Sequence, residues 1–158
     1  MSELTHVDES GRPRMVDITG KPDTVREAVA RGTVTMKPST LERLKTGSMT
    51  KGDVLTVAQL AGVMAAKQTP ALIPLCHPLL IGDIKVDLSL DEENSAVEIN
   101  ATVKSNGKTG VEMEALTATA IAALTVYDMC KAVDRGMRIG NIRLIKKSGG
   151  KSGTINLE

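Results

Sequence analysis

The chain has 158 residues, of which 41% are hydrophobic and 25% are charged, and its formal net charge is +1. This suits one soluble globular domain: no apolar run reaches the roughly 18 residues of a membrane span, and a single aromatic residue, Tyr127, leaves no platform for stacking nucleic-acid bases. Because the two cysteines lack the spacing of a disulfide framework or a metal site, we expect a reduced, cytoplasmic protein that binds neither nucleic acid nor a membrane.

The first 30 residues are polar and show no clear hydrophobic period. We therefore expect residues 1–30 to form a polar, mobile N-terminal arm. A short strand over 16–18 is the most structure that we expect within this arm. Residues 31–158 are then predicted to form a single domain.

The predicted domain opens with a β-prone run over 33–36. A short helix follows over 38–44 and ends at Gly47. Asp53 is a suitable N-cap for a longer helix over 54–67, which is apolar on most of its faces.

Alternating apolar and polar residues predict a pair of strands in the middle of the chain. They cover 84–90 and 97–103, and the polar turn at 91–94 between them indicates an antiparallel hairpin. A final strand is predicted over 139–145, where Gly140 marks a bulge.

A long helix is predicted from 116 to 134, a stretch that is almost entirely apolar. Residues 109–112 (Thr-Gly-Val-Glu) fit a capping box at its start, and Gly136 stops it. Small or apolar residues occupy nearly every side of this helix. One face of a sheet cannot bury such a helix, so we also expect it to contact a second subunit.

The predicted elements follow the order strand, divided helix, two strands, long helix, strand. This order suits an α+β sandwich of the ferredoxin-like type, in which helices pack on one face of an antiparallel sheet. No internal repeat is visible, so the chain is interpreted as one such domain.

An acid and a base, Asp128 and Lys131, interrupt the apolar long helix and lie three residues apart on one of its faces. Ionised groups beside apolar surface cost free energy unless they are paired or used, and the C-terminal end of a helix disfavours a negative charge. The pair is therefore the first candidate for chemistry. The alternative is an exposed ion pair that adds about a few tenths of a kcal/mol to stability.

Cys76 and His77 lie between two prolines, Pro74 and Pro78, which should make the segment stiff and suited to the edge of a binding site. In an extended chain the two side chains point in opposite directions, so one metal ion is not expected to take both. The alternative is a structural loop with an incidental histidine.

Several other charged residues are candidates for binding anions or moving protons. Glu112 and Glu114 occupy a first helical turn, where capping explains acids without any activity, and they point roughly 160° apart, so at most one reaches a given pocket. Lys51 precedes a helix N-terminus and forms a modest anion site, unless it is simply solvated. The basic, glycine-rich segment 146–153 is the clearest anion-binding candidate, against the alternative of a frayed basic tail.

These residues offer an acid, several lysines, one histidine in a stiff segment and a basic loop, but no nucleophile–base triad. General acid–base chemistry on a polyphosphorylated small molecule would use all of them. The competing interpretation is a non-catalytic oligomeric module that binds a nucleotide or another phosphorylated metabolite. The carboxylate beside Lys131 favours the enzyme, because binding a phosphate gains nothing from it.

Four blocks of the sequence, in this order, resemble the MoaC family of molybdenum cofactor biosynthesis proteins. They are Leu-Cys-His-Pro at 75–78, Lys-Thr-Gly-Val-Glu-Met-Glu-Ala-Leu-Thr at 108–117, Tyr-Asp-Met-Cys-Lys-Ala at 127–132 and Lys-Ser-Gly-Gly-Lys-Ser at 147–152. Shorter matches at 15–17 and 51–53 extend the resemblance over nearly the whole chain. It implies a ferredoxin-like lyase, assembled as a homohexamer from a trimer of dimers, with active sites at the dimer interfaces.

The resemblance also implies a reaction. A cyclo-dihydro-GTP is rearranged to cyclic pyranopterin monophosphate, and closure of the cyclic phosphate expels pyrophosphate. No cofactor is implied, no residue is expected to bind a metal, and Mg²⁺ remains open as a companion of the substrate phosphates.

The resemblance further implies roles for individual residues. The acid–base residue would be Asp128, with Lys131 as its partner and Lys51 in the same chemical centre. The residues implied to line the substrate site or its charged rim are Leu75, Cys76, His77, Met113, Glu114, Glu112, Lys147 and Arg26. The negative charge of a triphosphate would be balanced by Lys51, Lys131, Lys147 and Lys151. We expect the pKa of Lys131 to be lowered by the other lysines, and we expect the Asp128 carboxylate to be ionised.

Overall fold

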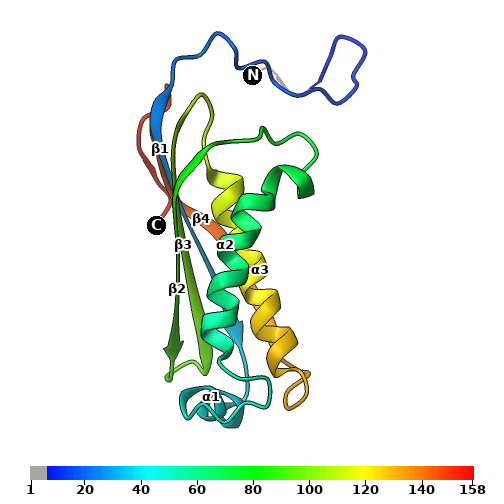
Figure 1. The fold of residues 1–158 in the computed structure, drawn as a ribbon, viewed down its shortest axis with the longest axis vertical. Coiled ribbons are helices and arrows are strands. Elements are labelled where there is room, and N and C mark those ends of the chain that lie inside the picture. Colours follow the sequence, from blue (N-terminus) through cyan, green and yellow to red (C-terminus); the bar gives the residue numbers. More distant parts are fainter. Residues whose placement is uncertain (1–6) are drawn as a thin grey trace.

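The computed structural model describes residues 7–158 as two layers, an antiparallel β-sheet with helices on one of its faces (Figure 1). The long helices run the length of the sheet, and the N-terminal segment lies across its upper end. The elements are β1 (Thr24–Thr35), α1 (Pro38–Lys45), α2 (Val54–Leu72), β2 (Ile81–Asp91), β3 (Ala96–Gly107), α3 (Glu112–Cys130), β4 (Arg138–Ser148) and β5 (Ile155–Asn156).

The sheet has the strand order β2-β3-β1-β4-β5, and every pairing in it is antiparallel. Strand β1 therefore lies in the middle, paired with β3 on one side and β4 on the other. The first four strands and the two long helices have the order and arrangement of a ferredoxin-like sandwich, so the predicted α+β fold is confirmed.

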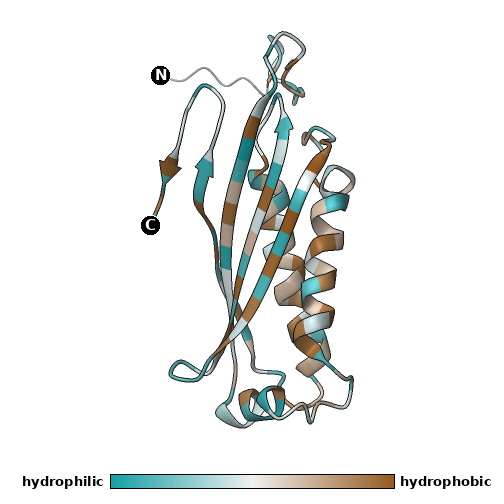
Figure 2. Cartoon of the chain, turned by 60° about the vertical axis from the view of Figure 1, so that its left-hand side comes forward, coloured by the Kyte–Doolittle hydropathy of each residue, from teal (hydrophilic) through white to brown (hydrophobic). Residues whose placement is uncertain are grey.

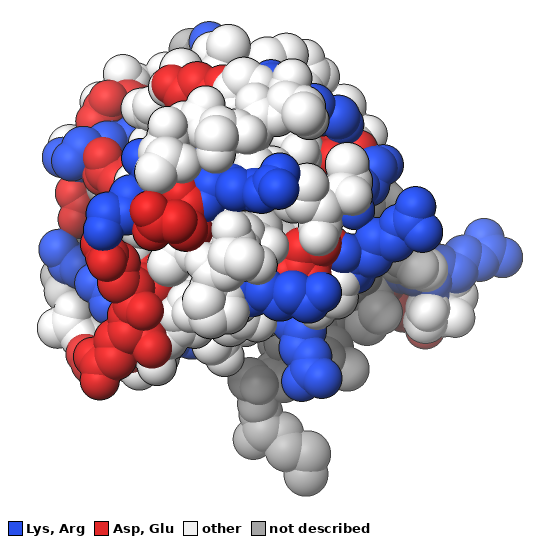
Figure 3. Space-filling model, turned by 90° about the horizontal axis from the view of Figure 1, so that it is seen from below, with Lys and Arg blue, Asp and Glu red and all other residues white. Residues whose placement is uncertain are grey.

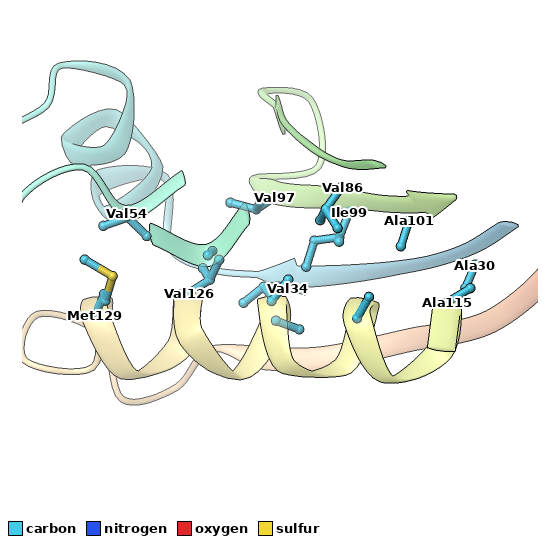
Figure 4. Close-up of a cluster of buried hydrophobic side chains, with 14 of the residues drawn as sticks. Ala30, Val34, Val54, Val86, Val97, Ile99, Ala101, Ala115, Val126 and Met129 are labelled. Carbon is cyan, nitrogen blue, oxygen red and sulfur yellow. The ribbon is translucent and has the colours of Figure 1, made fainter. Parts of the chain in front are cut away.

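The core lies between the sheet and the helices α2 and α3. Alternate residues of β3, including Val97, Ile99 and Ala101, are buried on the helical face, where Figure 4 shows them opposite Ala115 and Val126 of α3. Figure 2 shows the same alternation as bands along the strands. Small residues let the layers approach closely, since the core contains no tryptophan or phenylalanine.

Helix α3 is covered by the sheet on one side and by α2 on the other, and ten of its residues are buried within this one chain. Most of its apolar surface is therefore buried within the subunit, while Leu124 remains 53% exposed. The close approach depends on Gly62 of α2, where a Cβ would lie 3.1 Å from the carbonyl oxygen of Ala118. Exposed apolar side chains also lie along one face of α2, at Val57, Leu60, Met64 and Leu72.

Strand β1 begins at Thr24, so the predicted strand over 33–36 places its start too late. The missed part contains small and charged residues that hide its alternation. It is held instead by pairing with β3 and β4, distant in sequence. Residues 16–18 form no strand, and their prediction is wrong.

Helix boundaries also differ from the sequence patterns. Helix α2 continues past residue 67 to Leu72, through Pro70 in its last turn. The predicted capping box at 109–112 does not form, because the N-cap is Val111 and the Glu112 carboxylate pairs with Lys147 instead.

Helix α3 ends at Cys130, before the predicted end at 134. The buried carboxylate of Asp134 turns away to accept hydrogen bonds from the backbone N–H groups of Lys37 and Gly136 and from the hydroxyl of Thr40. The predicted irregularity in the last strand does occur, next to Gly140: Asn141 has φ 54° where the register between β1 and β4 shifts. No helix of the described residues is long and apolar enough to span a bilayer.

We expect Ile99→Ala to lower the free energy of unfolding by about 2–5 kcal/mol, because it leaves a cavity between β3 and the helices. Chemical denaturation measures this loss. The same change at Ile142, which is 38% exposed, removes the same atoms without opening a cavity and should cost much less. Equal losses at the two positions would contradict the assigned core.

Candidate active site

Two adjoining cavities open at the upper end of the molecule, where the N-terminal segment crosses the loops before β2 and α3. The first, here called the arm-side cavity, has a volume of about 400 Å³, and half of the residues that line it are aliphatic or Met. Its lining comprises Val16, Ile18, Lys21, Ile73, Leu75, Cys76, His77, Leu79, Thr109, Gly110, Glu112 and Met113. Five of the residues implied to bind substrate, at 75–77, 112 and 113, therefore lie together in it.

The second, here called the basic cavity, has a volume of about 540 Å³. It contains five basic side chains and one acid, which suits an anion of high charge. Its lining comprises Lys21, Pro22, Thr24, Arg26, Lys108, Thr109, Gly110, Glu112, Lys147, Gly150, Lys151 and Ser152. The glycine-rich segment 146–153, Arg26 and Glu112 thus meet here, although they are far apart in the sequence.

The wall of the arm-side cavity rests on a buried carboxyl group. Glu114 is 1% exposed, and the Cys76 thiol donates to its Oε1 at 3.8 Å. The pKa of Glu114 is raised, mainly by burial and to a smaller extent by the nearby Glu112 carboxylate. The pKa of the Cys76 thiol is raised to about 11 by burial and by Glu114. Cys76 therefore presents a neutral thiol to the cavity. Of Glu112 and Glu114, only Glu112 lines the cavity, which agrees with the prediction that at most one of them reaches a given pocket.

His77 points to a different partner from Cys76. Its Nε2 lies 2.7 Å from the backbone carbonyl oxygen of Val16, so this nitrogen donates to the carbonyl. The diverging directions of Cys76 and His77 agree with the sequence prediction. Within residues 7–158 no three histidine, cysteine or acidic side chains gather closely enough to hold a metal ion.

Arg26 fixes the wall that the basic cavity shares with the loop before α3. Its Nε and Nη2 donate to the carbonyl oxygens of Gly107 and Lys108, each at 3.3 Å. Gly150 passes so close to this guanidinium, with φ +70°, that no side chain fits there. Lys147 closes the opposite side through its ion pair with Glu112.

A third group of charges lies at the lower end of the molecule, where α3 ends. Asp128 accepts from Lys131 at 2.7 Å through Oδ1 and from Lys51 at 3.0 Å through Oδ2, and Lys51 also binds the Asp128 backbone carbonyl at 3.0 Å. Two cations on one carboxylate offset the unfavourable position of an acid at a helix C-terminus. We call these three residues the lower cluster; their side chains are about half exposed.

The charges of the lower cluster stabilise one another. Hydrogen bonds from Lys131 and then Lys51 lower the pKa of Asp128 to about 2, so it is ionised as expected. The pKa of Lys131 is raised, so the lowering expected from the sequence is wrong. The reason is that the Asp128 carboxylate lies 2.7 Å from the Lys131 ammonium and stabilises its charged form. Figure 3 looks at this end and shows basic side chains beside acidic ones.

The structure thus divides the predicted site residues between two ends of one chain. Asp128 lies sixteen residues along α3 from Glu112, a separation of about 24 Å at 1.5 Å per residue. Within one subunit the lower cluster cannot reach a ligand held in the upper cavities. The spacing along the predicted helix already separates Glu112 from Asp128, but the sequence could not show which of the distant motifs joins which end.

Two basic residues that line these cavities, Lys21 and Lys108, escaped the sequence analysis. Lys21 follows a glycine in a segment without regular structure, and its only signal was a turn of the type Gly-Lys-Pro. Lys108 donates to the carbonyl oxygen of Thr19 at 2.6 Å and so ties the N-terminal segment to the loop before α3. Its place at the start of the long motif at 108–117 was the available signal.

Fold and charges together define a ferredoxin-like domain with a basic cavity at one end and a lysine–aspartate cluster at the other. The chain belongs to the MoaC family, whose model matches residues 15–150. It is 66% identical to the cyclic pyranopterin monophosphate synthase of Roseiflexus sp. (strain RS-1), with 97% of each chain covered. Proteins of the same name from Roseiflexus castenholzii and Thermoanaerobacter sp. (strain X514) are 63% and 59% identical, over 100% and 98% of both chains. The resemblance found in the sequence motifs is confirmed.

The lower cluster makes a prediction about acid titration. Because the pKa of Asp128 is depressed, its ion pairs are complete above its ordinary pKa of 3.8 and are lost as the pH falls toward 2. We expect Lys131→Met to raise the pKa of Asp128 toward 3.8 and Lys51→Met to raise it less, as measured by carboxyl-carbon NMR. The control is Lys45→Met, which removes a remote ion pair with Glu92; an unchanged pKa in Lys131→Met would contradict the assignment.

Proposed function

We propose that the chain is a lyase of molybdenum cofactor biosynthesis that converts a cyclo-dihydro-GTP to cyclic pyranopterin monophosphate and pyrophosphate. The observation that carries this proposal is the pair of adjoining cavities, one lined by five aliphatic side chains and Met113 and one with five basic side chains. A ligand with a flat ring at one end and a triphosphate at the other matches both. The names of the relatives support the same reaction.

In this proposal the ring of the substrate occupies the arm-side cavity. The segment Leu75–His77 and Met113 form one wall of it, and behind this wall the buried carboxyl group of Glu114 accepts a hydrogen bond from the Cys76 thiol. His77 contributes its other ring nitrogen, Nδ1, because its Nε2 is held by the Val16 carbonyl. Apolar side chains with a few fixed polar groups suit a heterocycle that must be oriented, and the two charged residues of this lining, Lys21 and Glu112, lie on the border with the basic cavity.

The triphosphate occupies the basic cavity in this proposal. Arg26, Lys147 and Lys151 surround it, and the glycine-rich backbone at 149–150 leaves room for its oxygens. Pyrophosphate leaves when a sugar oxygen bonds to the phosphorus nearest the sugar and the bond from that phosphorus to the next phosphate breaks. Basic side chains stabilise the charge that pyrophosphate carries away. Mg²⁺ would bind to the phosphate oxygens and is not assigned to any side chain here.

The proton transfers of the rearrangement are assigned to the lower cluster of a second subunit. Asp128 is the base, because the two lysines hold it ionised, and Lys131 and Lys51 hold the protons beside it. A second subunit is required since the clusters are about 24 Å apart along α3. We place this subunit contact on the exposed apolar face of α2, and we propose that three such dimers form the hexamer.

The competing function is a non-catalytic module that binds a nucleotide. The basic cavity alone would serve it equally well. The lower cluster favours the enzyme, because a carboxylate shared by two lysines adds nothing to the binding of an anion. The two functions differ in whether pyrophosphate is released.

Product analysis with the cyclo-dihydro-GTP substrate tests the reaction directly. We expect the protein to release pyrophosphate and the pyranopterin in equal amounts, and Asp128→Asn to lower kcat by about 10²- to 10⁴-fold. Asp87→Asn, which changes an exposed aspartate on β2, is the control and should leave kcat unchanged. Tight nucleotide binding without pyrophosphate release would establish the binding module instead.

Mixing of inactive subunits tests whether each site combines two chains. Asp128→Asn and Lys147→Met are expected to be inactive alone, because each lacks one end of the site. Random hybrid dimers should recover about a quarter of the wild-type activity, since half of the dimers then hold one intact site of two. The matched control mixes Asp128→Asn with Lys131→Met, which damage the same end; recovery there, or none in the first mixture, would contradict a shared site.

A further inference from the structure

Lys21 lies on the border between the two cavities. The residues common to both linings are Lys21, Thr109, Gly110 and Glu112. Among the described residues, Lys21 is the only lysine or arginine in this group. A ligand that extends from one cavity into the other must pass its side chain.

The charge of Lys21 is available to a ligand. Within residues 7–158 it forms no ion pair, whereas Glu112, the acid on the same border, is paired with Lys147. Three of the other basic residues on the walls have partners in the protein: Arg26 binds two carbonyl oxygens, Lys108 binds that of Thr19 and Lys147 pairs with Glu112. Lys151 forms no ion pair among the described residues either, but it lines only the basic cavity and not the border.

The segment that carries Lys21 is held on both sides of the border. His77 binds the carbonyl of Val16 at 2.7 Å on the arm-side cavity, and Lys108 binds the carbonyl of Thr19 at 2.6 Å on the basic cavity. Asp17 accepts from the backbone and hydroxyl of Thr19, and the N–H of Lys21 donates to the carbonyl of Ile18 at 3.1 Å. These bonds form a compact turn that presents Lys21 at one place.

We propose that Lys21 binds the phosphate attached to the sugar, the group at which the new phosphorus–oxygen bond forms. This inference rests on the proposed function, in which the ring and the triphosphate occupy the two cavities. The phosphate next to the sugar then lies at their border, beside an unpaired ammonium. Lys21 is thus a catalytic residue that stabilises the negative charge on this phosphate's oxygens while the bond to pyrophosphate breaks.

Nucleotides that differ only in their phosphates distinguish this position from the rest of the basic cavity. Calorimetry with GMP and GTP is applied to the full-length protein and to Lys21→Gln and Lys151→Gln. We expect Lys21→Gln to weaken GMP and GTP by a similar factor, about tenfold or more, because both carry the phosphate next to the sugar. Lys151→Gln should weaken GTP by a similar factor and change GMP less than twofold, since it lines only the basic cavity.

Arg14→Gln is the matched control, because it removes one positive charge from the same segment at an exposed position outside both cavities. It should bind both nucleotides within twofold of the unaltered protein, and thermal unfolding checks that every variant is folded. The inference is overturned if Lys21→Gln binds GMP like the unaltered protein, or loses GTP alone. If the unaltered protein binds neither nucleotide and releases no pyrophosphate from the cyclic substrate, the proposed function fails as well, and this result is distinct from the others.

Discussion

The pairing of β1 with both β3 and β4 is the constraint on which the rest of the structure depends. It makes the strand after the N-terminal segment the centre of the sheet, so that chain regions far apart in sequence meet at one end. Its register places Arg26 opposite Ser105 and Ala28 opposite Lys147. The basic cavity is a consequence of this register, because a shift by one residue would turn Arg26 to the other face of the sheet.

Helix α3 sets the scale of the molecule and separates its two groups of charged residues. Its first turn supplies Glu112 to the border of the cavities, and its last turn supplies Asp128 to the lower cluster. Burial between the sheet and α2 makes it a rigid spacer of about 24 Å between them. A site that needs both groups of charges must therefore combine two subunits, and in this way the proposed function and the proposed assembly depend on each other.

The N-terminal segment follows no periodic pattern, yet it contributes to both cavities. Its contacts are made by backbone carbonyls of Val16 and Thr19, which any sequence would supply, so the side chains alone do not reveal them. The partners, His77 and Lys108, belong to motifs that the sequence does reveal. A binding site can thus include residues that are visible only through the groups that hold them in place.

The sequence by itself determined the fold class, the hairpin of β2 and β3 and the central parts of the helices. It also revealed the motifs around Cys76, Glu112, Asp128 and Lys147. Periodicity and local chemistry suffice for these features because they act over a few residues. The tertiary structure decided where β1 begins, where α3 ends and which motifs share a cavity. These outcomes depend on pairings between distant residues, such as Asp134 with the start of α1 and Lys147 with Glu112. Local preferences cannot determine such contacts, because their energy appears only when the chain has closed the loops between them.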